Sequence, residues 1–529
     1  MVKPGAGRKT DRYVAGQRTV FKIFFRDLIG LKKDRIMTFV LVALIASSIY
    51  MTIRMWFVEK LWPEGYNFFA SWEKIAEDLP IPKFLRGNSD ASAPMHEDMF
   101  LPRKIMINRS GSSRSMYRSG DREFVALNQF TKDILSQLFK KDGVRYIVVE
   151  KETDFYDTLK SKSILLDYPV QMPTRLLGQL YEAAESSIYS QVTSVKEIVI
   201  VPGDSVTNET IVMMKDSKTN IIYKYFIPFS KTDLEQEIEK YSKGNAANMF
   251  SAYELGFYRR STAAELQPQV VIDPFVFLDT TNEEIRVPAL SGFNPFTLGR
   301  LESMDSNIVS RILKVFDYNP NTISKHIDDS YTMVFVENYS TLKLHTNGLL
   351  EYSTIDSKKG IKLRKKTDGA DNMQSFLESM DTIAEMITQI WRALDMPDMP
   401  DMRISSDITD KKYGSYQLYI DYLYDGMPVL VEIAGEDGIE QMRHAIEITV
   451  ENNVLQSFRI FLRSYEKNEE ITANMPLIHA LDNLYNASSE PYVATDIFMG
   501  YVENGTGEPV RSCWNIQLKD GSTVAIASN

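Results

Sequence analysis

The stretch Ile36–Ile53, IMTFVLVALIASSIYMTI, contains 18 consecutive residues without a charged side chain. A helix rises about 1.5 Å per residue, so this length spans roughly 27 Å, close to the ~30 Å hydrocarbon core of a bilayer. A single segment in lipid must pair its own backbone groups, and a helix does so. Tyr50 and Trp56 fall at the positions of an interfacial aromatic belt. A buried core helix is the alternative, but its sequence normally includes polar residues at helical spacing. We therefore predict a transmembrane helix over residues 36–58.

The residues before this stretch predict its orientation. Residues 1–35 contain ten Lys or Arg and three Asp, and the positive-inside rule places such a segment in the cytoplasm. A cleaved signal peptide is the competing interpretation, but it has a short basic region and an apolar core of about 7–15 residues. We predict a cytoplasmic tail over residues 1–35, an uncleaved single-pass anchor in the cell membrane, and an extracytoplasmic body.

Composition describes this body and excludes some partners. The whole chain has a net charge of −11 although its first 35 residues are basic, so the remainder is strongly acidic. An acidic surface repels phosphate groups, which argues against nucleic acid as a partner. Cys513 is the single cysteine, so no intrachain disulfide can form. A large eukaryotic ectodomain usually contains several, and we interpret the chain as a surface protein of the Gram-positive type.

Beyond the span, helical patterns alternate with runs of short strands. The clearest helix has an apolar stripe from Phe376 to Leu394, and Asn347-Gly348 and Asp425-Gly426 are typical hairpin turns. We predict an α+β fold in which several extracytoplasmic domains each combine helices with an antiparallel meander. The predicted division after the span is a juxtamembrane connector over 59–103, a first domain over 104–245, a second over 246–370 and a C-terminal domain over 371–529.

The residues that could support catalysis do not form a recognisable pattern. No nucleophile elbow, glycine-rich dinucleotide turn or Cys-x-x-Cys motif occurs, and no two histidines have metal-binding helical spacing. Cys513 lies in a predicted strand, where a buried structural thiol is expected. An acidic cluster in one loop is typical of solvated surface; it comprises Glu432, Glu436, Asp437 and Glu440. The sequence therefore predicts no catalytic residues, no metal and no cofactor.

Four parts of the outer region carry a resemblance to known proteins: LPRKIMIN at 101–108, SILLDYPVQMPTRLLGQLY at 163–181, VFDYNPNT through TMVFVENYSTLKLHTNGLLEYST at 315–354, and the closing GYVENG and CWNIQLKDGS. These segments resemble the YycH/YycI family of membrane-anchored proteins. The family regulates the WalK-type (YycG) histidine kinase of Gram-positive bacteria. The resemblance implies a protein without enzymatic activity that associates with this kinase, and with a sister YycH/YycI-type regulator, to adjust signalling that controls cell-wall metabolism.

The predicted span offers one surface for such contact within the bilayer. Ala43 and Ser47 are four residues apart with Ala46 beside them, and small residues at this spacing let a second helix approach closely. Two other functions remain open. Edge strands of the meanders could bind a peptide or wall fragment by strand addition, and a membrane-tethered wall enzyme could carry clustered acids that are distant in sequence.

The first prediction concerns topology. Protease added to intact protoplasts should digest the body beyond about residue 60 and leave the N-terminal tail intact, because the charge bias before Ile36 retains the tail inside. Antibodies against each end would follow the fragments on a blot, with permeabilised cells as the control. Protection of the body in intact protoplasts would overturn the predicted orientation.

Overall fold

The computed structural model describes most of the chain from Glu97 onward. The described ranges are 97–110, 113–140, 143–183, 185–203, 208–242, 246–257, 271–280, 283–328, 330–337, 339–356, 358–363, 372–406, 414–434, 441–487, 492–519 and 521–526. They belong to one compact unit, residues 92–529. Within these ranges no helix has the length and apolarity needed to cross a bilayer. The cytoplasmic tail, the predicted span at 36–58 and most of the connector lie outside them, so the transmembrane helix stays a prediction.

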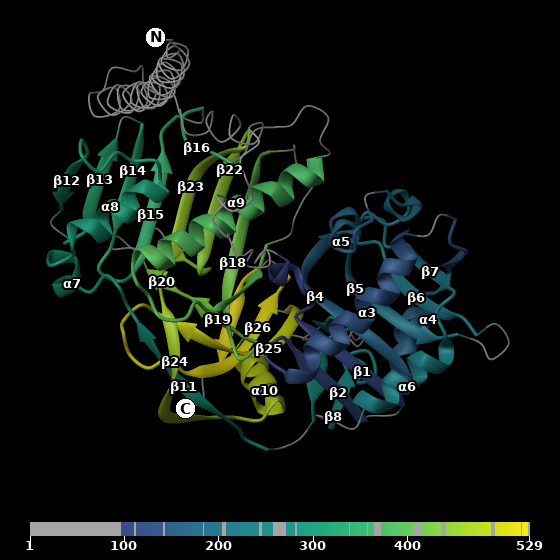
Figure 1. Cartoon of the computed structure of the whole chain (residues 1–529). Coiled ribbons are helices and arrows are strands. Elements are labelled where there is room, and N and C mark those ends of the chain that lie inside the picture. Colours follow the sequence, from purple (N-terminus) through teal and green to yellow (C-terminus); the bar gives the residue numbers. More distant parts are fainter. Residues whose placement is uncertain are drawn as a thin grey trace, which may run out of the picture. The chain divides into compact units, whose positions relative to one another are not determined.

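The first sheet of the described chain, which we call the N-terminal sheet, is antiparallel and has nine strands in the order β10-β8-β2-β1-β4-β5-β6-β7-β3 (Figure 1). Its strands are β1 (Lys104–Ser110), β2 (Ser113–Arg118), β3 (Tyr146–Val149), β4 (Ser163–Pro173), β5 (Ser194–Pro202), β6 (Thr210–Lys215), β7 (Ile222–Ile227), β8 (Ala246–Ser251) and β10 (Phe277–Asp279). The helices that accompany it in sequence are α3 (Arg122–Lys140), α4 (Glu152–Asp157), α5 (Thr174–Leu180) and α6 (Lys231–Tyr241), with the short 3-10 turns η3 (Thr158–Lys160) and η4 (Ser187–Ser190). Apolar side chains on both faces of the sheet are buried, in two separate clusters.

The second sheet, the C-terminal sheet, has 14 strands in the described chain, and its main path runs β12-β13-β14-β15-β23-β22-β18-β19-β25-β26-β27. The strands of this path are β12 (Ser324–Ile327), β13 (Met333–Glu337), β14 (Ser340–Leu344), β15 (Leu349–Thr354), β18 (Tyr416–Tyr424), β19 (Met427–Val431), β22 (Ile446–Glu451), β23 (Val454–Phe461), β25 (Val493–Glu503), β26 (Ser512–Leu518) and β27 (Thr523–Ile526). Three short strands join from the side: β9 (Val271–Ile272), β16 (Ile361–Lys362) and β17 (Asp401–Ile404). The sheet takes strands from both of the stretches 246–370 and 371–529, and the predicted division into three outer domains stays a prediction.

Helices and a long ribbon complete the C-terminal half. Figure 1 shows α9 lying across one face of the C-terminal sheet. The remaining helices are α7 (Leu298–Glu302), α8 (Ser306–Val315), α9 (Asn372–Ala393) and α10 (Leu477–Ala487). A two-stranded ribbon joins β11 (Ile285–Phe293) to β24 (Ser464–Asn474), and a smaller one joins β20 (Ile433–Ala434) to β21 (Gln441–Met442).

The structure confirms the α+β class and the strongest local patterns. The helix expected from Phe376 to Leu394 is α9, and the Trp391 indole N–H donates to the Pro397 carbonyl at 2.9 Å just beyond its end. The predicted hairpins form because their turns accept positive φ: Asp425 has φ 49° and Gly426 φ 72°, as the favoured two-residue hairpin turns require.

Several strands were not predicted, and the two longest of them have eleven residues each. One is β25, whose sequence VATDIFMGYVE alternates poorly because Asp496 and Gly500 interrupt the apolar positions. It pairs in parallel with β19 and β9, which are distant in sequence, and antiparallel with β26 across the connection 504–511, which is too long for a two-residue hairpin turn. The other is β24, whose middle residues are mostly exposed or half-buried and lack an apolar face. Tertiary pairing, which local patterns do not record, creates both strands.

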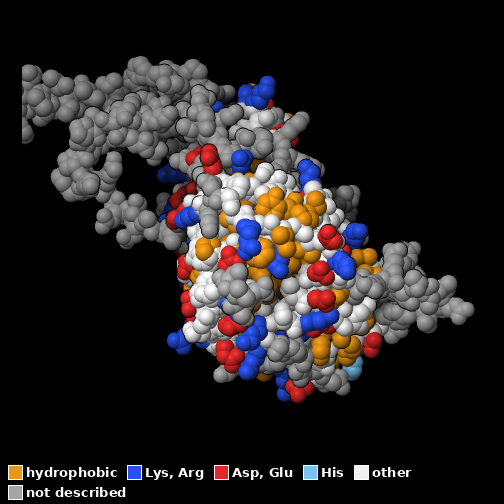
Figure 2. Space-filling view, turned by 90° about the vertical axis from the view of Figure 1, so that its right-hand side faces the viewer, with side chains coloured by type: hydrophobic (Ala, Val, Ile, Leu, Met, Phe, Trp, Pro, Cys, Tyr) orange, Lys and Arg blue, Asp and Glu red, His pale blue; other side chains and the backbone are white. Residues whose placement is uncertain are grey.

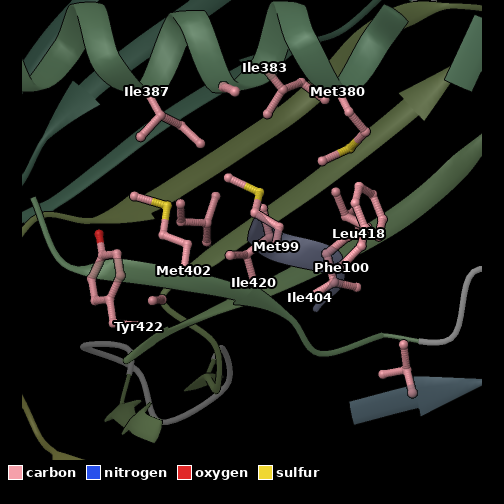
Figure 3. Close-up of a cluster of buried hydrophobic side chains, with 14 of the residues drawn as sticks. Met99, Phe100, Met380, Ile383, Ile387, Met402, Ile404, Leu418, Ile420 and Tyr422 are labelled. Atoms are coloured by element: carbon pink, nitrogen blue, oxygen red, sulfur yellow. The ribbon is translucent and has the colours of Figure 1, made fainter. Parts of the chain in front are cut away.

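The first described turn of the chain is packed inside the C-terminal core. The 3-10 turn η2 (Asp98–Phe100) places Met99 and Phe100, both almost fully buried, among side chains of α9, β17 and β18 (Figure 3). The Phe100 ring meets Phe376 of α9 edge to face, with centroids 6.4 Å apart. The last residues of the stretch predicted as connector, 59–103, are therefore anchored beneath α9 before the chain enters the N-terminal sheet as β1.

Removal of the Phe100 ring should destabilise the body strongly. Phe100→Ala deletes a buried aromatic side chain and leaves a cavity, and we expect a loss of about 3–5 kcal/mol in the free energy of unfolding. Urea unfolding of the detergent-purified chain, followed by tryptophan fluorescence, measures it. Val125→Ala on α3 is the control, because Val125 is 71% exposed and its truncation should change stability by less than about 0.5 kcal/mol. Equal midpoints for the two variants would show that η2 does not help to hold the core together.

Candidate functional site

A row of charged side chains crosses the face of the C-terminal sheet that points away from α9. Successive side chains of a strand point to opposite faces, so the residues between the core positions align across neighbouring strands. Glu351 on β15 lies opposite Arg459 on β23, which lies opposite Glu447 on β22. The Arg459 guanidinium donates to both carboxylates, with Nε 2.9 Å from Glu351 Oε1 and Nη1 2.9 Å from Glu447 Oε2. His345 closes this end, with Nε2 2.9 Å from Glu351 Oε2.

The row continues on β18 through a second histidine. Tyr419 lies opposite Glu447, and its ring stacks on the imidazole of His444, with centroids 4.7 Å apart and 7° between the planes. His444 Nδ1 lies 2.8 Å from Asp421 Oδ1, and the Ser405 hydroxyl donates to the other oxygen of Asp421. We call this set the charged row; it comprises His345, Glu351, Arg459, Glu447, Tyr419, His444 and Asp421.

Partners in the row shift the pKa values of its members. Burial alone raises the pKa of Glu351, but the hydrogen bond from His345 and the charges of His345 and Arg459 outweigh it and lower the pKa to about 2. Burial lowers the pKa of His444, yet the nearby Asp421 carboxylate overcomes this effect, with a further contribution from Glu447, and the net pKa is raised. The row is therefore a set of mutually paired charges, with Glu351 ionised at neutral pH.

A second charged group, the junction cluster, joins the two sheets; it comprises Arg103, Lys104, Asp167 and Asp496. Arg103 donates from Nε and Nη2 to Asp167 Oδ2 on β4, at 2.9 and 2.8 Å, and it also forms an ion pair with Asp496 on β25. Lys104 Nζ lies 3.0 Å from the same Asp167 oxygen. Asp167 thus belongs to the N-terminal sheet and Asp496 to the C-terminal sheet, and Arg103 bonds to both.

The junction cluster is buried, and both burial and the neighbouring charges shift the pKa values of its members. Burial lowers the pKa of Lys104 to about 8, although Asp167 opposes the shift. Burial raises the pKa of Asp167, but the charges of Arg103 and Lys104 outweigh it and lower the pKa to about 2. Two turns also meet close to this junction: a Cβ at Gly120 would lie 2.4 Å from the Asp425 backbone carbon, so that contact requires glycine.

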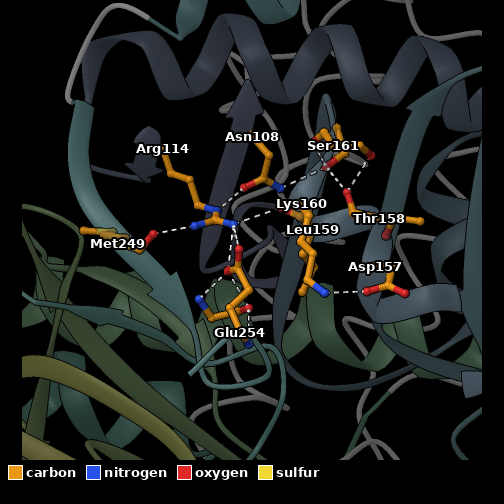
Figure 4. Close-up of polar contacts among 11 residues, drawn as sticks. Asn108, Arg114, Asp157, Thr158, Leu159, Lys160, Ser161, Met249 and Glu254 are labelled. Atoms are coloured by element: carbon orange, nitrogen blue, oxygen red, sulfur yellow. Dashed lines mark hydrogen bonds and ion pairs between the residues drawn. The ribbon is translucent and has the colours of Figure 1, made fainter. Parts of the chain in front are cut away.

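A third ion pair stabilises the N-terminal sheet from within. Arg114 on β2 is fully buried and donates to both oxygens of Glu254 at 2.8 Å, to Asn108 Oδ1 at 2.7 Å and to the carbonyls of Leu159 and Met249 (Figure 4). Such a satisfied guanidinium fixes the positions of the strand and loops around it. The geometry assigns it a structural role.

The residues considered from the sequence fall in different places. Cys513 is buried on β26, and burial raises the pKa of its thiol to about 11, so the thiolate is rare at neutral pH. Glu432 is exposed, while Glu436, Asp437 and Glu440 lie outside the described residues, as do Ala43, Ala46 and Ser47 of the predicted span. In the described ranges no three or more His, Cys, Asp or Glu side chains are grouped to hold a metal ion.

Sequence reasoning missed the charged row and the junction cluster. The histidines were considered only for metal-binding spacing, and the partners of His345 and His444 were not recognised. A signal did exist for part of the row, since Glu447 and Thr449 alternate with the apolar residues Ile446 and Ile448 on β22. Which charges would meet depends on strand pairing between distant segments, and the alternation does not contain that information.

Comparison with known proteins adds one finding. No protein-family model and no curated protein matches the chain. Among solved structures, the chain is similar to the crystal structure of YycH from Bacillus subtilis, with 13% sequence identity and a TM-score of 0.49, over 82% of this chain and 97% of that one.

The stability contributed by His444 should depend on pH. Its pKa is raised from 6.5 in the folded chain, so the folded state binds this proton more tightly than the unfolded state does. The contribution is fully present below the unfolded pKa of 6.5 and disappears as the pH rises through the higher folded pKa. His444→Gln should therefore lose more stability near pH 6 than near pH 8.5, measured as the difference in urea midpoint from the unmodified chain. His326→Gln on the exposed strand β12 is the control, and an equal loss from His444→Gln at both pH values would contradict the assignment.

Proposed function

We propose that the protein is a non-catalytic, membrane-anchored regulator of a WalK-type sensor histidine kinase that controls cell-wall metabolism. It acts by contact with the kinase outside and within the membrane, together with a sister YycH/YycI-type regulator. The observation that carries the proposal is the order of the sequence: a basic tail, an uncharged stretch at 36–53 and an acidic body whose segments resemble the YycH/YycI family. In this proposal the protein is a single-pass protein of the cell membrane with its body outside.

One of the segments that resemble the YycH/YycI family lies where contact with the kinase could be transmitted to the membrane anchor. LPRKIMIN at 101–108 contains Arg103 and Lys104 of the junction cluster and most of β1, and it follows η2 directly. The chain between the predicted span and the body therefore ends at the place where the two sheets are joined. A partner that changed the arrangement of the two sheets relative to each other would move this segment. That movement would in turn act on the connector and the span.

The chemistry of the charged groups supports a role without catalysis. Glu351, Glu447 and Asp421 are each engaged by a cation or a hydroxyl group, and their partners are side chains of the same sheet or of residues next to its strands. A general acid or base instead needs a proton-transferring atom that can reach a substrate. Among these residues the contacts serve mutual neutralisation, which stabilises the sheet.

A second candidate is an extracytoplasmic module that binds a peptide or wall fragment. The specific observation in its favour is that both sheets end in exposed strands, β3 and β12, and an edge strand can accept an added strand. A membrane-tethered wall enzyme is the less favoured alternative.

The regulator proposal predicts a change in kinase output. Deletion of the protein should change autophosphorylation of the kinase in matched membranes, because contact with the regulator biases the kinase between its signalling states. Unchanged autophosphorylation after deletion would overturn the proposed function.

The span contact has a separate test. Ala43→Leu combined with Ser47→Leu should preserve insertion but reduce co-purification with the kinase, because the added bulk prevents close helix approach. Ser48→Leu with Thr52→Leu is the matched control, since it adds similar bulk at the same spacing on a face rotated by about 140°. Equal co-purification of the two double variants would limit the contact to the outer body.

A further inference from the structure

The strand β3 is an exposed edge of the N-terminal sheet. Its sequence is Tyr-Ile-Val-Val, and in the described chain it pairs on one side, with β7. Tyr146, Ile147 and Val148 are 41%, 49% and 52% exposed, and Ile221 close to them is also exposed. Figure 2 views the side on which β6, β7 and α4 lie in Figure 1 and shows hydrophobic side chains gathered there among scattered charges. Three consecutive exposed apolar residues on one strand indicate a surface that is covered in the working state.

Among the described residues, the backbone groups on the outer edge of β3 have no partner strand. The Phe226 N–H donates to the Arg145 carbonyl at 2.9 Å, and these two residues face each other in the register of β3 with β7. Hydrogen-bonded and non-bonded pairs alternate along an antiparallel ladder, so Ile147 also bonds to β7 while the N–H and C=O groups of Tyr146 and Val148 point outward. A strand added here would find two residues ready to pair.

The edge strand β12 of the C-terminal sheet differs from β3 because it contains residues that oppose strand pairing. The exposed strand β12 carries Lys325 and His326 among its four residues. Charged side chains on an edge oppose the addition of another strand, and proteins commonly use them for this purpose. The four residues of β3 include no charge and no proline. The open strand edge at β3 therefore lacks the protection that β12 has.

We propose that β3 pairs with β3 of a second copy of this chain, antiparallel about a two-fold axis at Ile147, so that two N-terminal sheets join edge to edge. In this register Tyr146 pairs with Val148 of the second copy, and Val148 with its Tyr146. The outward N–H and C=O groups of each residue then bond to those of the other. The two Ile147 side chains meet in the non-hydrogen-bonded pair at the axis, where side chains approach most closely.

Charge and chemistry favour this occupant. β3 is preceded by Arg145, which pairs with Glu209 of its own chain, and followed by Glu150 and Lys151. Antiparallel pairing keeps the two Arg145 side chains at opposite ends of the paired strands, whereas parallel pairing would place them side by side. A lipid surface fits less well, because the outward N–H and C=O groups would lose water without gaining hydrogen bonds. Tyr146 is also supported by the rings of Tyr223 and Tyr225, both 5.8 Å away, which holds it in place for a partner strand.

Disulfide trapping of the full-length chain in membranes tests the proposal. Ile147→Cys should cross-link to itself under mild oxidation, because Cα atoms of a non-hydrogen-bonded pair lie about 4.5 Å apart, within the range of about 4.4–6.8 Å that disulfides accept. The native Cys513 is buried and should not react, so the unmodified chain gives the background. Val125→Cys on α3, which is 71% exposed, is the control for random collision.

A second variant tests the pairing itself. Val148→Lys in the Ile147→Cys chain places a charge on the edge without removing a bond to β7, and it should reduce the cross-linked dimer several-fold while the urea midpoint is unchanged. We expect Ile147→Cys to give a disulfide-linked dimer whose yield falls when Val148→Lys is added. Val125→Cys should give little dimer. The proposal is overturned if Ile147→Cys yields no more dimer than Val125→Cys, if Val148→Lys leaves the yield unchanged, or if Ile147→Cys is trapped to a different protein instead of its own copy.

Discussion

Arg103 forms ion pairs with carboxylates from two different sheets, and the rest of the described structure depends on this contact. Its planar guanidinium can serve two acceptors at once, which a lysine ammonium does less well. Asp167 and Asp496 are buried, so without the arginine Asp496 would carry an uncompensated charge in a medium of low dielectric constant and Asp167 would lose one of its two ion-pair partners. The two ion pairs of Arg103 therefore contribute little net stability. They instead require the two sheets to adopt one arrangement relative to each other.

Apolar contacts of the residues just before Arg103 also hold this part of the chain in place. Met99 and Phe100 are held under α9, and β1 begins at Lys104, so six residues of chain connect the C-terminal core, the junction cluster and the N-terminal sheet. Burial of Phe100 and of Lys104 holds both ends of this path. For a protein proposed to signal through its anchor, this path matters, because it is where the described body continues towards the predicted connector.

The two faces of the C-terminal sheet are stabilised by different kinds of interaction. One face buries apolar side chains against α9, while the other carries the charged row, in which each acid is matched to a cation or a hydroxyl across the strands. Half-buried charges of this kind are acceptable only when they are paired, since each lost partner leaves a desolvation penalty. His444 gives the face a sensitivity to pH near neutrality that lysine or arginine would not provide.

The sequence by itself determined the features that depend on neighbours along the chain. These are the α+β class, the long amphipathic helix α9 and hairpins whose turns need positive φ at Asp425, Gly426 and similar residues. The uncharged stretch at 36–53 and its basic flank likewise predict an anchor from local composition alone. Tertiary structure decided which distant strands pair: β25 lies between β19 and β26, and Arg103 reaches both Asp167 and Asp496. Strand register and buried ion pairs join residues tens to hundreds of positions apart, and a pattern with a period of two or 3.6 residues holds no information about such partners.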